Sequence, residues 1–254
     1  MKLLTTGNPK VLKGTKLGYL TSILHLAPQW MSGFNTCPMA TNGCAASCLN
    51  TAGRGGMFAG EKTAHLSGAE MVNAVKSGRL QNKIQAARIR KTKLFFTSRS
   101  VFMAQLVSDI QRAIRLANRH GLTPVFRLNG TSDIRWELYE VTVSGVTYPN
   151  IMTAFPTVQF YDYTKLPNRR NLPVNYHLTF SLAESNEAHA VTAMANGLNV
   201  AAVFHKLPAE YMGRTVINGD ETDLRFLDAR GVVVGLKAKG KAKKDLTGFV
   251  KGTK

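Results

Sequence analysis

Apolar positions along the chain follow two spacings in turn, and this alternation predicts helices and strands. The clearest helix begins near Ser98 and ends at Gly121, because apolar residues recur every four positions between them. Residues 61–91 are also predicted to be helical, with a break at Ser77–Gly78, and residues 186–196 form a shorter helix. Helices therefore account for much of the first half of the chain.

Strands are predicted where short apolar or β-branched runs stand between these helices and polar turns. They fall at residues 17–28, 124–128, 157–161, 175–181, 199–204 and 231–236. The run 93–97 is too short to decide between a strand and the lead-in to the next helix.

Strands that alternate with helices at this spacing indicate a parallel α/β fold. Two architectures fit: a complete or partial (β/α) barrel, and an open doubly wound sheet. Polar residues follow several of the strands, and a barrel gathers such strand ends around one mouth, whereas an open sheet spreads them along an edge. The sequence therefore predicts a complete or partial parallel barrel. We expect a single domain, residues 1–254, with a barrel core at about 17–236 and a basic tail at about 237–254 that forms a solvated arm.

The cysteines are the most informative residues of the chain. There are three, Cys37, Cys44 and Cys48, and they follow the first predicted strand within twelve residues of one another. Because Pro38 and Gly43 break the segment into a loop, the thiols can converge on one point, which predicts a metal or iron–sulfur site. An odd number of cysteines argues against a disulfide framework.

Three interpretations of the cysteine loop remain open. A [4Fe-4S] cluster on three thiolates would leave one iron free to bind a small-molecule ligand. A structural zinc ion would need a fourth ligand such as His25 or His65, although His25 also fits a packed position on the first strand. The third interpretation is a reduced cysteine cluster without metal. Reduced thiols and the lack of a long apolar run predict a soluble, cytoplasmic protein with no membrane partner.

Charge is the second strong signal in the sequence. The chain has 33 lysines and arginines against 15 acids, a formal charge of +18. Ten basic residues lie in residues 79–120 with Asp109 as the one acid, and eight follow from Arg230 onward. Such a balance favours a polyanionic partner, nucleic acid above all, although a solvated basic surface explains it equally well.

Polar residues at the predicted strand ends are the candidate site residues. Asp133 and Asp162 each follow or end a strand and could act as catalytic acid or base, or cap a turn. Asn129, Ser132 and Ser181 would line the pocket for a bound cofactor or ligand.

The chain resembles the phage family known as gene product eighty-eight over roughly residues 20–245. The residues that carry the resemblance are Cys37 to Cys48, 127–134 with Trp136, 160–165, Asn175–Tyr176 with Thr179 and Ser181, Gly219–Asp220 with Asp223, and 235–240. In architecture, a strand, a three-cysteine loop and an incomplete barrel also resemble the radical S-adenosylmethionine enzymes. That family spaces its cysteines as C-x3-C-x2-C, whereas this chain has C-x6-C-x3-C. Where those enzymes carry a Gly-Gly-Glu-like segment, this chain has Thr-Ser-Arg-Ser, and Arg99 suits a carboxylate or phosphate.

The resemblance implies a phage-encoded iron–sulfur protein in the host cytoplasm. Its [4Fe-4S] cluster would be held by the three cysteines, and S-adenosylmethionine would be the cofactor if the protein is a radical enzyme. The alternative is a nonenzymatic iron–sulfur protein that binds nucleic acid or a host factor, with the cluster serving structure or redox sensing.

Overall fold

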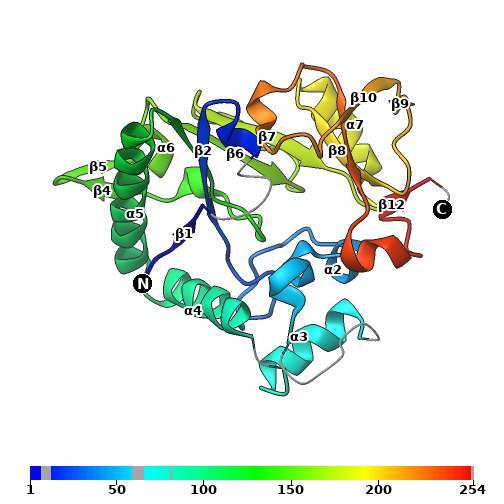
Figure 1. The fold of residues 1–254 in the computed structure, drawn as a ribbon, viewed down its shortest axis with the longest axis horizontal. Coiled ribbons are helices and arrows are strands. Elements are labelled where there is room, and N and C mark those ends of the chain that lie inside the picture. The colour runs from blue at the N-terminus through cyan, green and yellow to red at the C-terminus, as the bar shows by residue number, and fades with distance from the viewer. Residues whose placement is uncertain (7–12, 59–65, 81, 253–254) are drawn as a thin grey trace.

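The computed structural model describes residues 1–6, 13–58, 66–80 and 82–252, which form a mixed α/β structure around one large sheet (Figure 1). The strands are β1 (Leu4–Thr5), β2 (Tyr19–Leu24), β3 (Thr123–Arg127), β4 (Val141–Val143), β5 (Val146–Tyr148), β6 (Gln159–Thr164), β7 (Tyr176–Ser181), β8 (Val200–Phe204), β9 (Glu210–Tyr211), β10 (Arg214–Asn218), β11 (Val233–Lys237) and β12 (Val250–Lys251).

Helices occupy the connections between these strands. The α-helices are α2 (Asn42–Ala46), α3 (Gly68–Lys76), α4 (Lys83–Thr97), α5 (Arg99–Arg119), α6 (Ile151–Ala154) and α7 (Glu187–Ala195). Short 3-10 turns are η1 (Leu49–Thr51), η2 (Gly53–Gly56), η3 (Trp136–Leu138), η4 (Arg225–Leu227) and η5 (Gly240–Lys244).

The large sheet is mostly parallel, as the sequence predicts, but it does not close into a barrel. Its order is β1-β2-β3-β6-β7-β8-β11-β10-β9, and all neighbours from β2 to β10 run parallel. The short edge strands β1 and β9 are antiparallel to their neighbours and do not pair with each other in the described residues. The prediction of a parallel α/β fold is confirmed, whereas no barrel closure exists here because β1 and β9 end the sheet.

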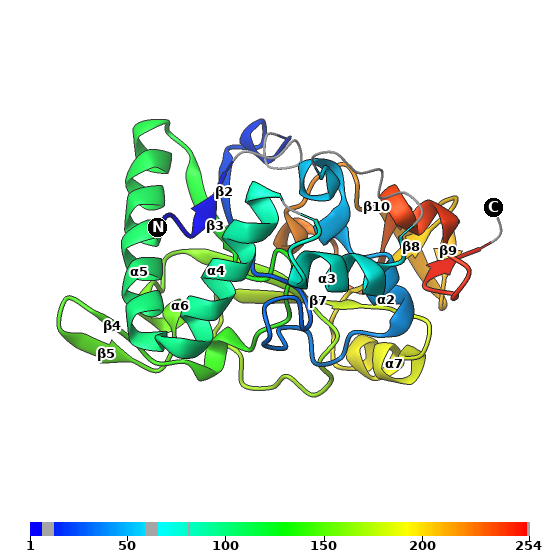
Figure 2. The ribbon, with the colours of Figure 1, turned by 90° about the horizontal axis from the view of Figure 1, so that it is seen from below.

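The two faces of the sheet are covered in different ways. The outer face bears Phe126, Phe160 and Leu178, which pack in one core with the buried side of α5. Helices α4 and α5 pack against each other along this side (Figures 1 and 2). The inner face bears Val125 and Tyr161, which pack with Leu224 from the segment around η4. A turn segment thus lies on the inner face, on the side opposite the helices.

Most predicted elements are present with shifted ends. The predicted helical region 61–91 contains α3 and α4, and its break falls where expected, at Gly78, whose φ is 76°. Residues 59–65 of that region lie outside the described residues. The run 93–97 is the last part of α4, with Phe95 fully buried in the core.

The prediction of a solvated basic arm after residue 237 is wrong for the described part of that segment. Strand β12 pairs with β8 at Val250↔Val203, beyond the point where β7 pairs with β8 at Ser181↔Ala201. Ala242 and Phe249 are buried in a small cluster with Ala183. The apolar residues between the lysines give this segment a side that can be buried.

Removal of a core side chain from α5 should destabilise the fold. Leu106 is fully buried among residues from the outer face, so Leu106→Ala is expected to lower the free energy of unfolding by about 2–5 kcal/mol. The control Val101→Ala changes a residue that is 58% exposed on the same helix and should cost within about 0.5 kcal/mol. Urea unfolding followed by circular dichroism measures both. Equal losses would contradict this packing.

Candidate functional site

The cysteine loop lies across the carboxyl edge of the sheet, the edge at which β3, β6 and β7 end. Glu184, which follows β7, accepts hydrogen bonds from the Thr41 hydroxyl at 2.7 Å and from the Gly43 N–H at 2.6 Å. A Cβ built on Gly43 would approach Glu184 Oε2 to 2.8 Å and Phe249 Cβ to 2.7 Å. Glycine at position 43 therefore permits the close contact of α2 with the loop after β7 and with the C-terminal segment, which lies beside α2 in Figure 1.

A second set of hydrogen bonds ties the start of the cysteine loop to β2 and to the loop after β3. The Thr36 hydroxyl donates to the Ala27 carbonyl at 2.7 Å, and the Thr36 carbonyl accepts from the Asp133 N–H at 2.8 Å. Thr36 is fully buried. Cys37, the next residue, is thereby held beside Asp133.

Helix α4 holds the other end of the loop through Asn50. The Asn50 side chain donates to Gln85 Oε1 at 2.9 Å, and Gln85 Nε2 donates to the Asn50 carbonyl at 2.8 Å. Arg88 Nη1 donates to the same carbonyl at 3.0 Å and also to Asn50 Oδ1. Because the Asn50 N–H donates to Cys48 Sγ at 3.5 Å, this network positions the third cysteine.

The environments of the three thiols differ. Burial is the main cause that raises the pKa of Cys37 to about 11 and that of Cys48 to about 12, and the neighbouring Cys44 contributes to both increases. Cys37 Sγ accepts from the Gln29 N–H at 3.5 Å, as Cys48 Sγ does from Asn50. Within the described residues, no three His, Cys, Asp or Glu side chains surround a single point as ligands of one metal ion would.

Asp133 is the predicted acid that lies closest to the cysteines. Its carboxylate accepts from the Thr164 hydroxyl at 2.8 Å and from the Lys165 N–H at 2.7 Å. Burial raises the pKa of this carboxyl, and its charge raises the pKa of Cys37. Asp133 therefore joins the loop after β3 to the end of β6, next to the first thiol.

Asp162 and Asn129 are buried and bonded to each other, whereas Ser132 follows Thr131, whose carbonyl accepts from Cys37 Sγ at 3.8 Å. Asp162 is fully buried and accepts from the Asn129 N–H at 2.7 Å and from the Tyr176 hydroxyl at 2.9 Å. Asn129 Oδ1 in turn accepts from the Ser132 hydroxyl and from the Trp136 indole. Asp162 occupies the alternate position from Tyr161 on β6, so its side chain points to the outer face, where this network shapes the loop after β3.

Arg99 also lies away from the cysteines. Its guanidinium lies 3.8 Å from the ring centroid of Phe95 and 4.3 Å from that of Tyr139, and its Nε donates to the Phe95 carbonyl. Arg99 is the first residue of α5, because the segment before it continues α4 instead of forming a strand. The side chain packs on aromatic rings, where a carboxylate or phosphate ligand was expected.

Ser181 lies at the end of β7 and accepts a hydrogen bond from Lys165 Nζ at 2.7 Å. The same ammonium group lies 5.7 Å from the ring centroid of Phe249. Ser181 and Lys165 therefore sit together at the carboxyl edge, beneath the C-terminal segment.

His25 is a half-buried histidine that follows β2 directly. Burial, together with the positive charges of Arg88, Arg127 and Lys91, lowers its pKa to about 3. Its Nδ1 lies 3.4 Å from the Thr5 hydroxyl. His65, the other histidine considered for zinc, lies outside the described residues.

Sequence reasoning missed the polar character of the inner face. Lining it are Thr21, Arg127, Tyr161, Tyr163, His177, Thr179, Arg225 and Asp228, each of which has at least one buried side-chain polar atom without a hydrogen-bond partner. Part of the signal was present in residues 177–181, where each second residue is polar, whereas residues 161–165 show no such alternation because Asp162 and Thr164 are polar as well. Only the strand register shows that these residues share one face.

The fold and the site define the class of this protein. It is a mixed α/β protein with a mostly parallel sheet and a cysteine loop at the carboxyl edge of that sheet. The family model described as Gene product 88 matches residues 2–251, so the chain belongs to the gene product 88 family. The comparisons with curated proteins and with solved structures found no match, and nothing in them supports kinship with radical S-adenosylmethionine enzymes. None of the helices in the described ranges has the length and apolar character needed to cross a membrane.

The buried carboxyl of Asp162 should make stability depend on pH. Burial raises its pKa from 3.8 to about 7, so the folded state retains a proton that the unfolded state loses. The contribution of Asp162 to the free energy of unfolding should be fully present below about pH 4 and be lost between about pH 4 and 7, by at most about 1.4 kcal/mol per pH unit. Asp162→Asn should flatten this fall, because the amide still accepts from the Asn129 N–H and can donate to the Tyr176 hydroxyl.

Urea unfolding at a series of pH values tests this dependence. The control Glu210→Gln alters an exposed carboxyl on β9 and should leave the profile of the wild type unchanged. A profile for Asp162→Asn that matches the wild type would show that Asp162 is not the group responsible.

Proposed function

We propose that this protein is an iron–sulfur protein in which Cys37, Cys44 and Cys48 hold a [4Fe-4S] cluster at the carboxyl edge of the sheet. The observation that carries the proposal is that all three thiols lie on one short loop, which hydrogen bonds fix to the loop after β7, to the loop after β3 and to α4. Two of the three sulfurs accept backbone N–H groups, which is a known way in which proteins tune cluster potentials.

The arrangement of the thiols suits a cluster better than a single ion. In a four-iron cluster each thiolate binds a different iron, so the sulfurs stand around a cube and not around one point. Among the described residues the three thiols do not surround one point, so a single metal ion held by all three is disfavoured. Their raised pKa values favour the protonated form in the metal-free protein, so iron binding would release protons.

The charge near the loop also agrees with an anionic cluster. Arg88 is mostly buried, lowers the pKa of Cys48, and has an Nε atom without a hydrogen-bond partner. Lys165 stands at the same edge, beside Asp133. These cations would stabilise the net negative charge of a cluster bound by three thiolates.

We extend the proposal to an enzyme by assigning a small-molecule ligand to the cluster. A cluster with three protein thiolates has an iron without a protein ligand, and S-adenosylmethionine is the small molecule to test there because a three-cysteine loop after the first long strand is the one feature shared with enzymes that use it. When bound to a reduced cluster, it would supply one-electron cleavage chemistry. Asp133 and Ser181 are the predicted site residues that stand at this edge.

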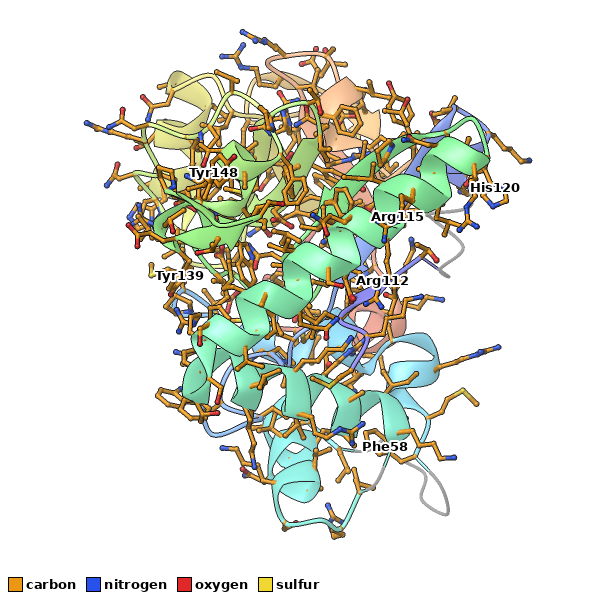
Figure 3. All side chains as sticks on the ribbon, turned by 90° about the vertical axis from the view of Figure 1, so that its left-hand side faces the viewer. Phe58, Arg112, Arg115, His120, Tyr139 and Tyr148 are labelled. Atoms are coloured by element: carbon orange, nitrogen blue, oxygen red, sulfur yellow. The ribbon has the colours of Figure 1, made fainter. Side chains whose placement is uncertain are left out.

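A specific observation favours a second function, contact with nucleic acid. Arg112, Arg115 and Arg119 are exposed along one side of α5, as Figure 3 shows for the first two. The one acid of α5, Asp109, is buried and bonded to Leu3, Leu4 and Arg112. Evenly spaced exposed arginines without exposed acids suit the phosphates of a nucleic acid. Arg88 and Lys91 do not belong to this surface, because both side chains are bound within the fold.

Loss of one cysteine should remove the cluster. We expect Cys44→Ala, produced and purified without oxygen, to contain little iron and sulfide and to lack the cluster absorption of the wild type, because one attachment point is missing. Met39→Leu, at an exposed position in the same loop, should retain the full cluster. Iron and sulfide analysis with absorption spectroscopy measures the difference.

Wild-type protein with stoichiometric zinc and no iron would contradict the cluster. With the same anaerobic sample, addition of S-adenosylmethionine should change the electron paramagnetic resonance signal of the reduced cluster. An unchanged signal would restrict the cluster to a structural or redox-sensing role.

The arginines of α5 should govern the salt dependence of nucleic-acid binding. Replacement of Arg112, Arg115 and Arg119 by glutamine should weaken binding to duplex DNA or RNA and lower the slope of log affinity against log salt by about 0.9 per lost phosphate contact. The matched control replaces Lys206, Arg214 and Arg230, three exposed cations elsewhere on the protein. Fluorescence anisotropy over a range of salt concentrations gives both slopes, and equal effects would show that the charge acts without a defined surface.

A further inference from the structure

The inner faces of β6 and β7 are polar from one end to the other. Along β6 the inward residues are Tyr161 and Tyr163, followed by Lys165, and along β7 they are His177, Thr179 and Ser181. The strand register pairs Tyr161 with His177 and Tyr163 with Thr179. Parallel sheets are usually covered on both faces and their strands are rich in branched apolar residues, so a polar row of this length requires a separate explanation.

Several of these groups have buried polar atoms without a partner in the protein. Tyr163 Oη, Thr179 Oγ1, His177 Nε2 and Arg127 Nε are buried and make no hydrogen bond. The atoms belong to one neighbourhood, because the Arg127 guanidinium lies 4.8 Å from the Tyr163 ring centroid and Thr179 is paired with Tyr163. Native proteins satisfy the great majority of such atoms, through the protein itself or through bound molecules.

Most of the unpaired groups on this face can donate a hydrogen bond, so what they lack is an acceptor. Arg127 can only donate, and the tyrosine and threonine hydroxyls can donate as well. The acid nearest Arg127 is Asp223, which already accepts from its Nη1 at 2.9 Å, and Asp228 is paired with Arg225 at 3.3 Å. A molecule rich in acceptor oxygens would therefore complete this set of donors.

Lys165 adds one positive charge at the end of the row. Its ammonium donates to Ser181, and among the described residues no carboxylate lies within ion-pair distance of it. Asp133 is the nearest acid, but its two oxygens are bonded to Thr164 and to the Lys165 backbone. Since Arg127 and Arg225 are each matched by an acid, the inner face has a net charge that suits one anionic group.

We propose that the inner face binds a small molecule that bears a carboxylate or phosphate group. Its anionic group contacts Lys165 and Ser181. Its other acceptor atoms contact Tyr163, Thr179 and Arg127. This site uses no cysteine, so it stands apart from the proposed cluster, although Lys165 and Ser181 lie at the same carboxyl edge.

Inorganic phosphate and acetate serve as the two probes, added to the wild-type protein at constant ionic strength while the thermal midpoint of unfolding is recorded. A saturable rise with phosphate identifies a phosphate-bearing ligand, and a saturable rise with acetate identifies a carboxylate-bearing one. Lys165→Met should abolish the rise, and Tyr163→Phe, which removes one hydroxyl and no charge, should weaken binding about tenfold. Lys243→Met removes an exposed lysine from η5 and should bind as the wild type does.

The proposal fails if neither probe gives a saturable rise, or if Lys165→Met and Lys243→Met respond alike.

A second measurement needs no ligand. In probe-free buffer Tyr163→Phe and Thr179→Val should leave the midpoint unchanged or slightly higher, because each removes a hydroxyl that has no protein partner. A clear drop in both midpoints would mean that the protein itself satisfies these hydroxyls and would overturn the proposal. Replacement of all three cysteines by serine should leave probe binding intact, so failure of the cluster and failure of this site are distinguishable.

Discussion

Hydrogen bonding of the irregular cysteine loop is the constraint on which the carboxyl edge depends. A loop packed over a sheet must find partners for its backbone groups, since buried groups without partners are costly. Three contacts anchor the loop: Glu184 accepts from Gly43, Thr36 donates to Ala27, and Asn50 accepts from Arg88. The partners of the loop lie after β7, after β2 and in α4, so the positions of the thiols follow from the sheet and from α4 together.

The two faces of the sheet divide the chemistry of the protein. Asp162 and Asn129 point to the helix-covered side, where they shape the loop after β3 within an apolar core. Tyr163 on β6 and Thr179 on β7 point to the other side of the sheet, where η4 packs and polar groups remain unpaired. Two adjacent residues of one strand, such as Asp162 and Tyr163, can therefore lie in different environments, the first in the apolar core and the second among unpaired polar groups.

Net charge is a poor guide to which cations face solvent. Lys91 donates to the Leu3 carbonyl and Arg88 to Asn50, so two residues of the most basic segment hold the fold together. Arg99 packs against Phe95 and Tyr139. The arginines on the exposed side of α5 are available to a partner, as are Lys83, Arg90 and Lys93 on α4, and only the packing of the two helices selects them.

The sequence alone determined the parallel α/β class, the family and the cysteine loop after the first long strand, because periodicity and local spacing carry that information. The break at Gly78 and the burial of α5 were predictable for the same reason. Strands β1, β9 and β12 were not, because each has two residues and exists only through pairing with a distant strand. Tertiary structure alone decided that β1 and β9 end an open sheet, that the C-terminal segment packs beside Cys44, and that Asp162 turns away from the edge. Which face a strand residue occupies depends on register and on what packs against each face, and these are properties of contacts between residues far apart in the chain.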